Sequence, residues 1–422
     1  MHPTKSLTLC AVLAAILLRP SPAVGAGPPS TLGGNAVTRW NTIATAAVLV
    51  DPGRVRDSRT MAMVHGAIHD AVNAIDRRYE PYTSDASAPG ASVNAAVAAA
   101  AHDVLVVLSP SRVAITDAEY AAALAEVPDA AAKAAGISIG QLCAAETLNR
   151  RATDGLADAA LPVYVPSGAP GDYDFTPPFN FALFPGWGRL VPWGIDLGNH
   201  RVPGPDPLHS LRYALDFNYL KAIGSLNSPW RTADQTEIAR FWGEAAPAGW
   251  NRIANTAIRQ KQLDPWKSAR ILALVNFAIA DSFIASFDAK YHFRFWRPST
   301  AIQRADEDDN PLTEQDADWQ PLFSTPPLVS PPIPDYPSNH AVVGAAAAEV
   351  LAHYFGDRVR FSTTSTSLPG VTRSFRGFTD AAVENGRSRA YAGIHFRRAI
   401  IDGYAQGRGI GRKIEKLLPP VE

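Results

Sequence analysis

Cysteine is scarce in this chain of 422 residues, which contains two. Cys10 lies in an apolar N-terminal stretch, and Cys143 lies in an alanine-rich segment much further along the chain. We therefore expect no disulfide framework, so burial of a hydrophobic core must supply the stability. Hydrophobic residues make up 46% of the chain, which is ordinary for a globular protein and excludes a disordered one.

An excess of charge is also missing, because 39 Lys and Arg residues face 40 Asp and Glu residues. Without a broad cationic field, the sequence predicts no nucleic-acid partner. The chain has no CxxC pair, no HExxH pattern and no glycine-rich phosphate loop. Beyond the N-terminal stretch we predict no membrane span, since the longest apolar helical segment carries Asp281.

The first 26 residues have the pattern of an export signal. Lys5 supplies a basic start, residues 7–18 form an apolar core, and small residues lead to Ala26. The apolar core is shorter than the roughly 20 residues that a transmembrane helix needs. We therefore predict a Sec-type signal peptide over residues 1–26 and a secreted or periplasmic protein.

Apolar residues recur with the period of a helix in most of the chain, whereas the alternation of strands is nearly absent. The predicted helices span residues 40–49, 60–75, 92–108, 117–135, 138–157, 232–243, 250–262, 265–290, 340–355, 378–389 and 397–418. Between the helices, residues 362–367 are all Ser or Thr and are predicted to form a loop. The predicted fold class is all-α, with two tandem four-helix-type bundles and long proline-rich loops.

The predicted organisation has three parts after the signal peptide. An N-terminal helical region spans residues 27–162, and a connection rich in proline, glycine and aromatic residues spans 163–215. A C-terminal helical region follows over residues 216–422 and contains a second proline-rich loop at 304–337. We expect this last region to be catalytic because the chemically suggestive patterns all lie there.

Three short patterns in the C-terminal region combine cations, a hydroxyl and two histidines. They are KYHFRFWRP from Lys290, PSNH from Pro337 and SRAYAGIH from Ser388. Arg297 and Arg389 supply two-pronged guanidinium forks that match an oxyanion, and Lys290 adds a compact charge. Ser338 is predicted to cap a helix whose first backbone amides could point at an anion. Together these patterns predict an oxyanion site.

The two histidines suit a division of labour within such a site. A neutral imidazole can act as a nucleophile or a metal ligand, while a second one that titrates near neutral pH can pass protons. His395 follows Gly393 and directly precedes the last predicted helix, which favours a position facing the site. His340 lies two residues after Ser338, at the start of its own helix.

In this order, K-x6-R-P, P-S-x-H and S-R-x5-H resemble the motifs of the vanadium-dependent haloperoxidase and type 2 phosphatidic acid phosphatase superfamily. The segments FDAKYH, FWRP, DYPSNH and YAGIHF, together with AMVHGAIHDAVNAI near the N-terminus, are similar to its bacterial haloperoxidase-like branch. The resemblance implies an enzyme that uses hydrogen peroxide to oxidise halide to hypohalous acid. Its partners would be hydrogen peroxide, a halide and a small organic acceptor.

The resemblance also implies a bound vanadate, with His395 as the axial ligand of the metal. The groups that would neutralise or hydrogen-bond the vanadate oxygens are Lys290, Arg297, Arg389, Ser338 and the amide of Asn339. Lys290 would also polarise the peroxide, and His340 would be the acid–base group. The vanadium would act as a Lewis acid.

Two alternatives share these residues. Phosphate has the shape and charge of vanadate, so a soluble acid phosphatase could use His395 as a nucleophile and His340 as the acid for the leaving group. A helical protein that only binds an oxyanion is the other alternative. It is suggested by two departures: Asn339 stands where the family commonly has glycine, and Ala399 where many members have an acid. Asp402 is the candidate in the sequence to orient His395 instead.

Overall fold

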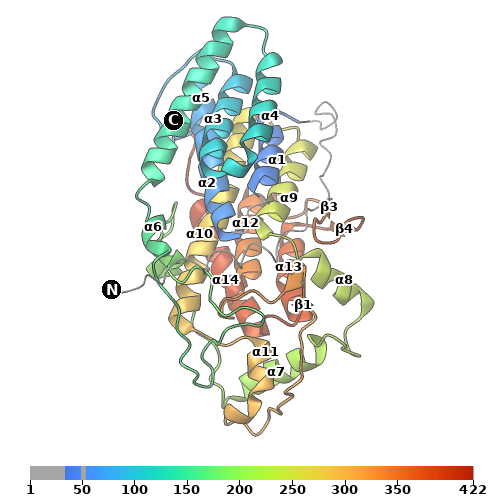
Figure 1. The fold of residues 1–422 in the computed structure, drawn as a ribbon. Helices are drawn as coiled ribbons and strands as arrows, with labels where there is room; N and C mark the ends of the chain where they lie inside the picture. The colour runs from blue at the N-terminus through green and yellow to red at the C-terminus, as the bar shows by residue number, and fades with distance from the viewer. Residues whose placement is uncertain (1–33, 49–53, 422) are drawn as a thin grey trace, which may run out of the picture. The chain divides into compact units, whose positions relative to one another are not determined.

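The computed structural model of the chain describes residues 34–48 and 54–421 (Figure 1). The predicted signal peptide, residues 1–26, lies outside these described residues. The described residues are mostly helical, with two short antiparallel strand pairs, so the predicted all-α class is confirmed.

Helices of the N-terminal region follow the alanine-rich segments. Their bounds are α1 (Ala36–Val48), α2 (Arg54–Ile75), α3 (Val93–Leu108), α4 (Val113–Ala125), α5 (Ala130–Arg151) and α6 (Leu156–Ala159). The predicted break between residues 135 and 138 is wrong, because α5 runs through it. The helices separate instead at Asp129, which accepts hydrogen bonds from the amides of Ala131 and Ala132 and so caps α5.

The helices of the C-terminal region surround the candidate site. Their bounds are α7 (Leu211–Ile223), α8 (Ala233–Phe241), α9 (Ala246–Gln260), α10 (Pro265–Phe293), α11 (Pro298–Gln303), α12 (Asn339–Phe355), α13 (Phe378–Tyr391) and α14 (Arg397–Ile414). Helix α10 packs against α2 from the N-terminal region and against α12 from its own (Figure 1). One hydrophobic core therefore extends from Val37 to Leu418 through both predicted bundles.

Asp281, a buried carboxylate on α10, binds the connection between the two regions. Between residues 160 and 210, the regular structure consists of the 3₁₀ turns η3 (Trp187–Arg189) and η4 (Leu197–His200) and of isolated β-bridges. The buried side chain of Asp281 accepts hydrogen bonds from the backbone amides of Trp193, Gly194 and Ile195 at 2.7, 2.9 and 3.2 Å. This explains why an acidic residue lies inside a long, apolar and buried helix.

That helix is long and apolar enough to cross a membrane by length and composition. However, 94% of the relevant stretch of α10 is buried inside the structure, as expected for a core helix.

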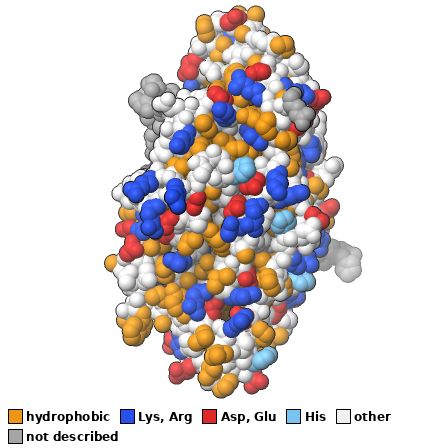
Figure 2. All heavy atoms as spheres, turned by 180° about the vertical axis from the view of Figure 1, so that it is seen from behind, with side chains coloured by type: hydrophobic (Ala, Val, Ile, Leu, Met, Phe, Trp, Pro, Cys, Tyr) orange, Lys and Arg blue, Asp and Glu red, His pale blue; other side chains and the backbone are white. Residues whose placement is uncertain are grey.

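On the face shown in Figure 2, acidic and basic side chains both occur, with apolar side chains between them.

The strands are short. Strand β1 (Ser324–Thr325) pairs with β2 (Leu328–Val329), and β3 (Phe361–Thr364) pairs with β4 (Thr372–Phe375). The predicted loop at 362–367 is therefore wrong in its first half, which belongs to β3. Phe361 and Phe375 are opposite each other and buried, so packing of these aromatic side chains overrides the turn-forming composition of the segment.

Candidate functional site

Lys290 and Arg297 lie on either side of the turn that ends α10. The helix ends at Arg294, which has a left-handed backbone conformation (φ 51°), and Pro298 then starts α11 with Arg297 as its N-cap. Both cationic side chains are completely buried. The turn therefore brings two positive charges into the interior.

Backbone carbonyls of one segment, Ile333 to Asp335, hold both cations. The Lys290 ammonium donates to the carbonyls of Pro334 and Asp335 at 2.7 and 2.9 Å, and Arg297 Nε donates to the carbonyl of Ile333 at 2.6 Å. Since an ammonium has three N–H groups, Lys290 has one left for a ligand. Burial and the neighbouring Arg297 hold the pKa of Lys290 well below its usual range.

Arg297 donates a second hydrogen bond through Nη1, whereas its Nη2 atom is available to a ligand. Its Nη1 donates to the carbonyl of Ile394 at 2.7 Å and lies 3.2 Å from Nε2 of His395. Its Nη2 is buried and has no hydrogen-bond partner in the described structure. A buried cationic donor without a partner is costly, which is expected where a ligand supplies the acceptor.

Ser338 is the N-cap of α12, as predicted, but its side chain does not cap the helix. The hydroxyl is buried and has no hydrogen-bond partner among the described residues, and the same holds for the side-chain oxygen of Asn339, the first residue of α12. The first backbone amides of a helix have no acceptor within the helix. The N-terminus of α12 therefore offers donors, and a partial positive charge, to an anion.

His395 lies in the turn between α13 and α14. Gly393 makes this turn, with a φ of +76° that favours glycine, and a Cβ there would lie 2.3 Å from the carbonyl oxygen of Gly224. Burial and the positive field of its neighbours, Arg297 first, lower the pKa of His395 well below its usual value. The imidazole is therefore neutral and can offer a nitrogen lone pair.

The other predicted site residues also lie near His395, because Arg389 and His340 both contribute to the field that lowers its pKa. Arg389, buried on α13, donates through Nη2 to the carbonyl of Trp242 at 2.8 Å and through Nε to the hydroxyl of Ser388 at 2.9 Å. Nε2 of His340 lies 3.2 Å from the carbonyl oxygen of Glu244. The structure thus brings Lys290, Arg297, His340 and Arg389 near His395, from three segments distant in sequence.

Sequence reasoning missed Asp335. The Nδ1 atom of His395 lies 2.8 Å from Oδ1 of Asp335, and both side chains are buried. Burial raises the pKa of Asp335 to about 7, against the opposing effect of Arg297 and Lys290. The signal in the sequence was an acid in an otherwise apolar, proline-rich stretch, PPIPDYP.

The interpretation of Asp402 as the partner of His395 is wrong. Its carboxylate accepts a hydrogen bond from the hydroxyl of Tyr336 at 2.5 Å and pairs with Arg398 at 2.7 Å. Asp402 lies on the face of α14 that packs on the segment before α12, so its side chain is used to hold that segment.

Residues 270–419 match the family model of the VCPO second helical-bundle domain. A curated relative, the vanadium chloroperoxidase of Curvularia inaequalis, is 30% identical over an alignment 215 positions long, which covers 43% of this chain and 34% of the relative. The chain thus aligns with about a third of that relative's length. The predicted resemblance to the vanadium haloperoxidase superfamily is confirmed.

Solved structures match over much more of the chain. A bacterial vanadium-dependent iodoperoxidase has a TM-score of 0.77 and 26% identity over 92% of this chain and 96% of its own. A holo-type bacterial vanadium-dependent chloroperoxidase has a TM-score of 0.70 and 16% identity over 87% and 93% of the two chains, which shows the shared helical fold.

Proposed function

We propose that this protein is a vanadate-dependent haloperoxidase that oxidises halide with hydrogen peroxide. The observation that carries the proposal is the buried cluster of Lys290 and Arg297 around a neutral His395, with donors on Arg297 and Ser338 that no described group satisfies. These residues fit an oxyanion of vanadate type, because cations and unpaired donors surround one imidazole nitrogen. Bound vanadate would supply Lewis-acid activation of peroxide.

The residues of this chain have distinct parts in that function. Nε2 of His395, beside Arg297, would be the metal ligand, and the third N–H of Lys290 would bind an oxygen of the ligand. Nη2 of Arg297, the hydroxyl of Ser338 and the amides that begin α12 would hold further oxygens. His340 would move protons at the rim of the cluster, where it is only partly buried. Arg389 would contribute charge.

The experiment is a pair of assays on purified protein, each run with and without added vanadate. Iodide and bromide oxidation by hydrogen peroxide is followed with a phenolic dye, and hydrolysis of an aryl phosphate is measured in parallel. We expect halogenation that depends on vanadate, with little hydrolysis. Phosphate release that vanadate inhibits, without halogenation, would instead assign the protein to the phosphatases, which use the same neutral histidine as a nucleophile.

A substitution separates catalysis from binding. His340→Ala should lose halogenation while its phosphate affinity stays close to that of the wild type, because His340 moves protons and does not hold the anion. His353→Ala, on the same helix with a side chain that is 49% exposed, is the matched control and should keep both. Equal rates for His340→Ala and the wild type would refute this assignment, and silence of the wild type in both assays would favour a protein that only binds an oxyanion.

We also propose that the chain is exported through the Sec pathway after removal of residues 1–26, as the basic start and apolar core of this segment suggest. N-terminal sequencing of the protein recovered from the periplasm or medium tests this. A mature protein that keeps Met1 would contradict it.

A further inference from the structure

We propose that Asp335 is the positioning residue of His395, holding its ring so that Nδ1 carries the proton and Nε2 presents its lone pair to the oxyanion. This inference rests on the proposed oxyanion site. It concerns the orientation of the ring and does not depend on which reaction follows.

The contacts of the imidazole differ on its two sides. Nδ1 lies 2.8 Å from Oδ1 of Asp335, which is ion-pair distance between two buried atoms. Nε2 lies 3.2 Å from Nη1 of Arg297, a donor, so this nitrogen faces the cationic cluster. A carboxylate has only acceptors and a guanidinium only donors, so the two neighbours favour the proton on Nδ1 and the lone pair on Nε2.

Asp335 is itself well fixed by its backbone. Its amide donates to the carbonyl of Phe295 at 2.9 Å, and its carbonyl accepts from the ammonium of Lys290 at 2.9 Å. The same residue therefore contacts Lys290 through its backbone and His395 through its side chain. A shift of this segment would move a cation and the imidazole together, which couples two parts of the site.

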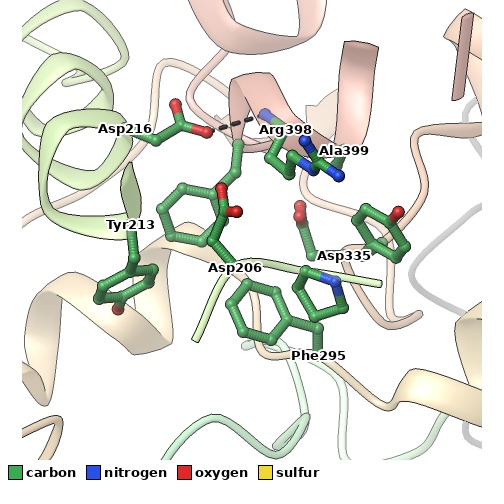
Figure 3. Close-up of a pocket in the computed structure, with 10 residues that line it drawn as sticks. Asp206, Tyr213, Asp216, Phe295, Asp335, Arg398 and Ala399 are labelled. Carbon is green, nitrogen blue, oxygen red and sulfur yellow. Dashed lines mark hydrogen bonds between the residues drawn. The ribbon is translucent and has the colours of Figure 1, made fainter. Parts of the chain in front are cut away.

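A cavity beside Asp335 indicates a second position from which a carboxylate could reach His395. A small cavity of about 10 Å³, enough for one water molecule, is lined by Asp335, Ala399 and Arg398, among others. Figure 3 shows the Asp335 carboxylate directed toward Ala399 and Arg398. An acid at position 399, one turn beyond His395 in sequence, would therefore point into the region that the Asp335 carboxylate now occupies.

The test uses two readouts that do not require turnover. NMR of protein labelled with ¹⁵N in histidine reports which ring nitrogen of His395 carries the proton, with His395→Gln used to assign its signals. Calorimetry gives the affinity for inorganic phosphate, the probe for the oxyanion. In the wild type we expect the proton on Nδ1, and a proton on Nε2 would overturn the proposal without any variant of Asp335.

The variants test the cause. Asp335→Asn should shift the proton toward Nε2 and weaken phosphate binding by roughly 10- to 100-fold, the usual effect of removing the partner of a ligand histidine. In the Asp335→Ala/Ala399→Asp double variant, the relocated carboxylate should restore the Nδ1 proton and most of the affinity that Asp335→Ala loses. Asp402→Asn, the matched control, should leave the proton of His395 on Nδ1 and the phosphate affinity within about twofold of the wild type.

Unchanged tautomer and phosphate affinity in folded Asp335→Asn would overturn the proposal. So would an equal effect of Asp402→Asn, because the loss would then reflect general disturbance of the buried acids near α14. If the wild type shows the expected tautomer and the variants behave as described but no halogenation is found, the positioning role stands and only the proposed reaction fails.

Discussion

Replacing Arg297 by lysine keeps a positive charge but removes the planar fork. In the structure, Nε and Nη1 of Arg297 are used on the carbonyls of Ile333 and Ile394, at 2.6 and 2.7 Å, and Nη2 is unpartnered. Three different nitrogens of Arg297 face the two carbonyls and the ligand, and the one nitrogen of a lysine ammonium cannot occupy all three positions. The variant Arg297→Lys must therefore lose either the anion contact or a carbonyl contact.

The expected loss follows from one charge-assisted hydrogen bond. Such a bond contributes about 1.5–3 kcal/mol, so the Kd for phosphate or vanadate should rise roughly 10- to 150-fold. A buried carbonyl left without its donor should also lower the free energy of unfolding by about 1–3 kcal/mol. Titration calorimetry with phosphate and urea unfolding measure the two effects separately.

Arg294→Lys is the matched control for this change. Arg294 lies three residues earlier, its side chain is 39% exposed and it pairs with Asp172, so its replacement should change the phosphate Kd by less than about twofold. A folded Arg297→Lys protein that binds phosphate as tightly as the wild type would refute the assignment of Nη2 as an anion donor. Equal losses of phosphate affinity in Arg297→Lys and Arg294→Lys would show that the affinity depends on the general positive potential and not on a hydrogen bond from Nη2.

Three further substitutions test other parts of the structure. Ser338→Ala removes one neutral donor and should weaken phosphate binding by about 2- to 12-fold in calorimetry, with no loss of stability, since the hydroxyl has no partner among the described residues. Burial raises the pKa of Asp281 to about 7, above its value of 3.8 in the unfolded chain, so its contribution to stability is greatest below about pH 4 and is lost as the pH rises to about 7. Asp281→Asn should remove up to ~4 kcal/mol of this pH dependence. In urea unfolding, the free energy of unfolding of the variant should therefore rise relative to that of the wild type between about pH 4 and pH 7. The same pH dependence in both proteins would contradict the burial argument. A Cβ on Gly407 would lie 2.1 Å from the carbonyl oxygen of Val342, so Gly407→Ala should lower the urea midpoint, whereas Gly409→Ala on the same helix, with 3.4 Å to its nearest neighbour, should leave it unchanged or raise it.

Local sequence patterns are enough to predict the fold class and to identify the residue types of the proposed oxyanion site. Helical periodicity depends on residues three and four apart, so α10, α12 and α13 begin within one residue of their predicted positions. The residue types needed to bind an oxyanion can also be identified in the sequence, since the cations, the helix-capping serine and the two histidines belong to three short motifs.

The partners of these groups, in contrast, depend on how the helices pack. Asp335 and Asp402 are both acids close to a motif, yet packing of α14 on the segment before α12 directs Asp335 to His395 and Asp402 to Tyr336 and Arg398. Likewise, only the folded chain shows that Nη2 of Arg297 has no partner in the part of the chain that the structure describes. Contacts between segments distant in sequence depend on how helices pack and on which carbonyls reach each cation, and a local pattern contains neither.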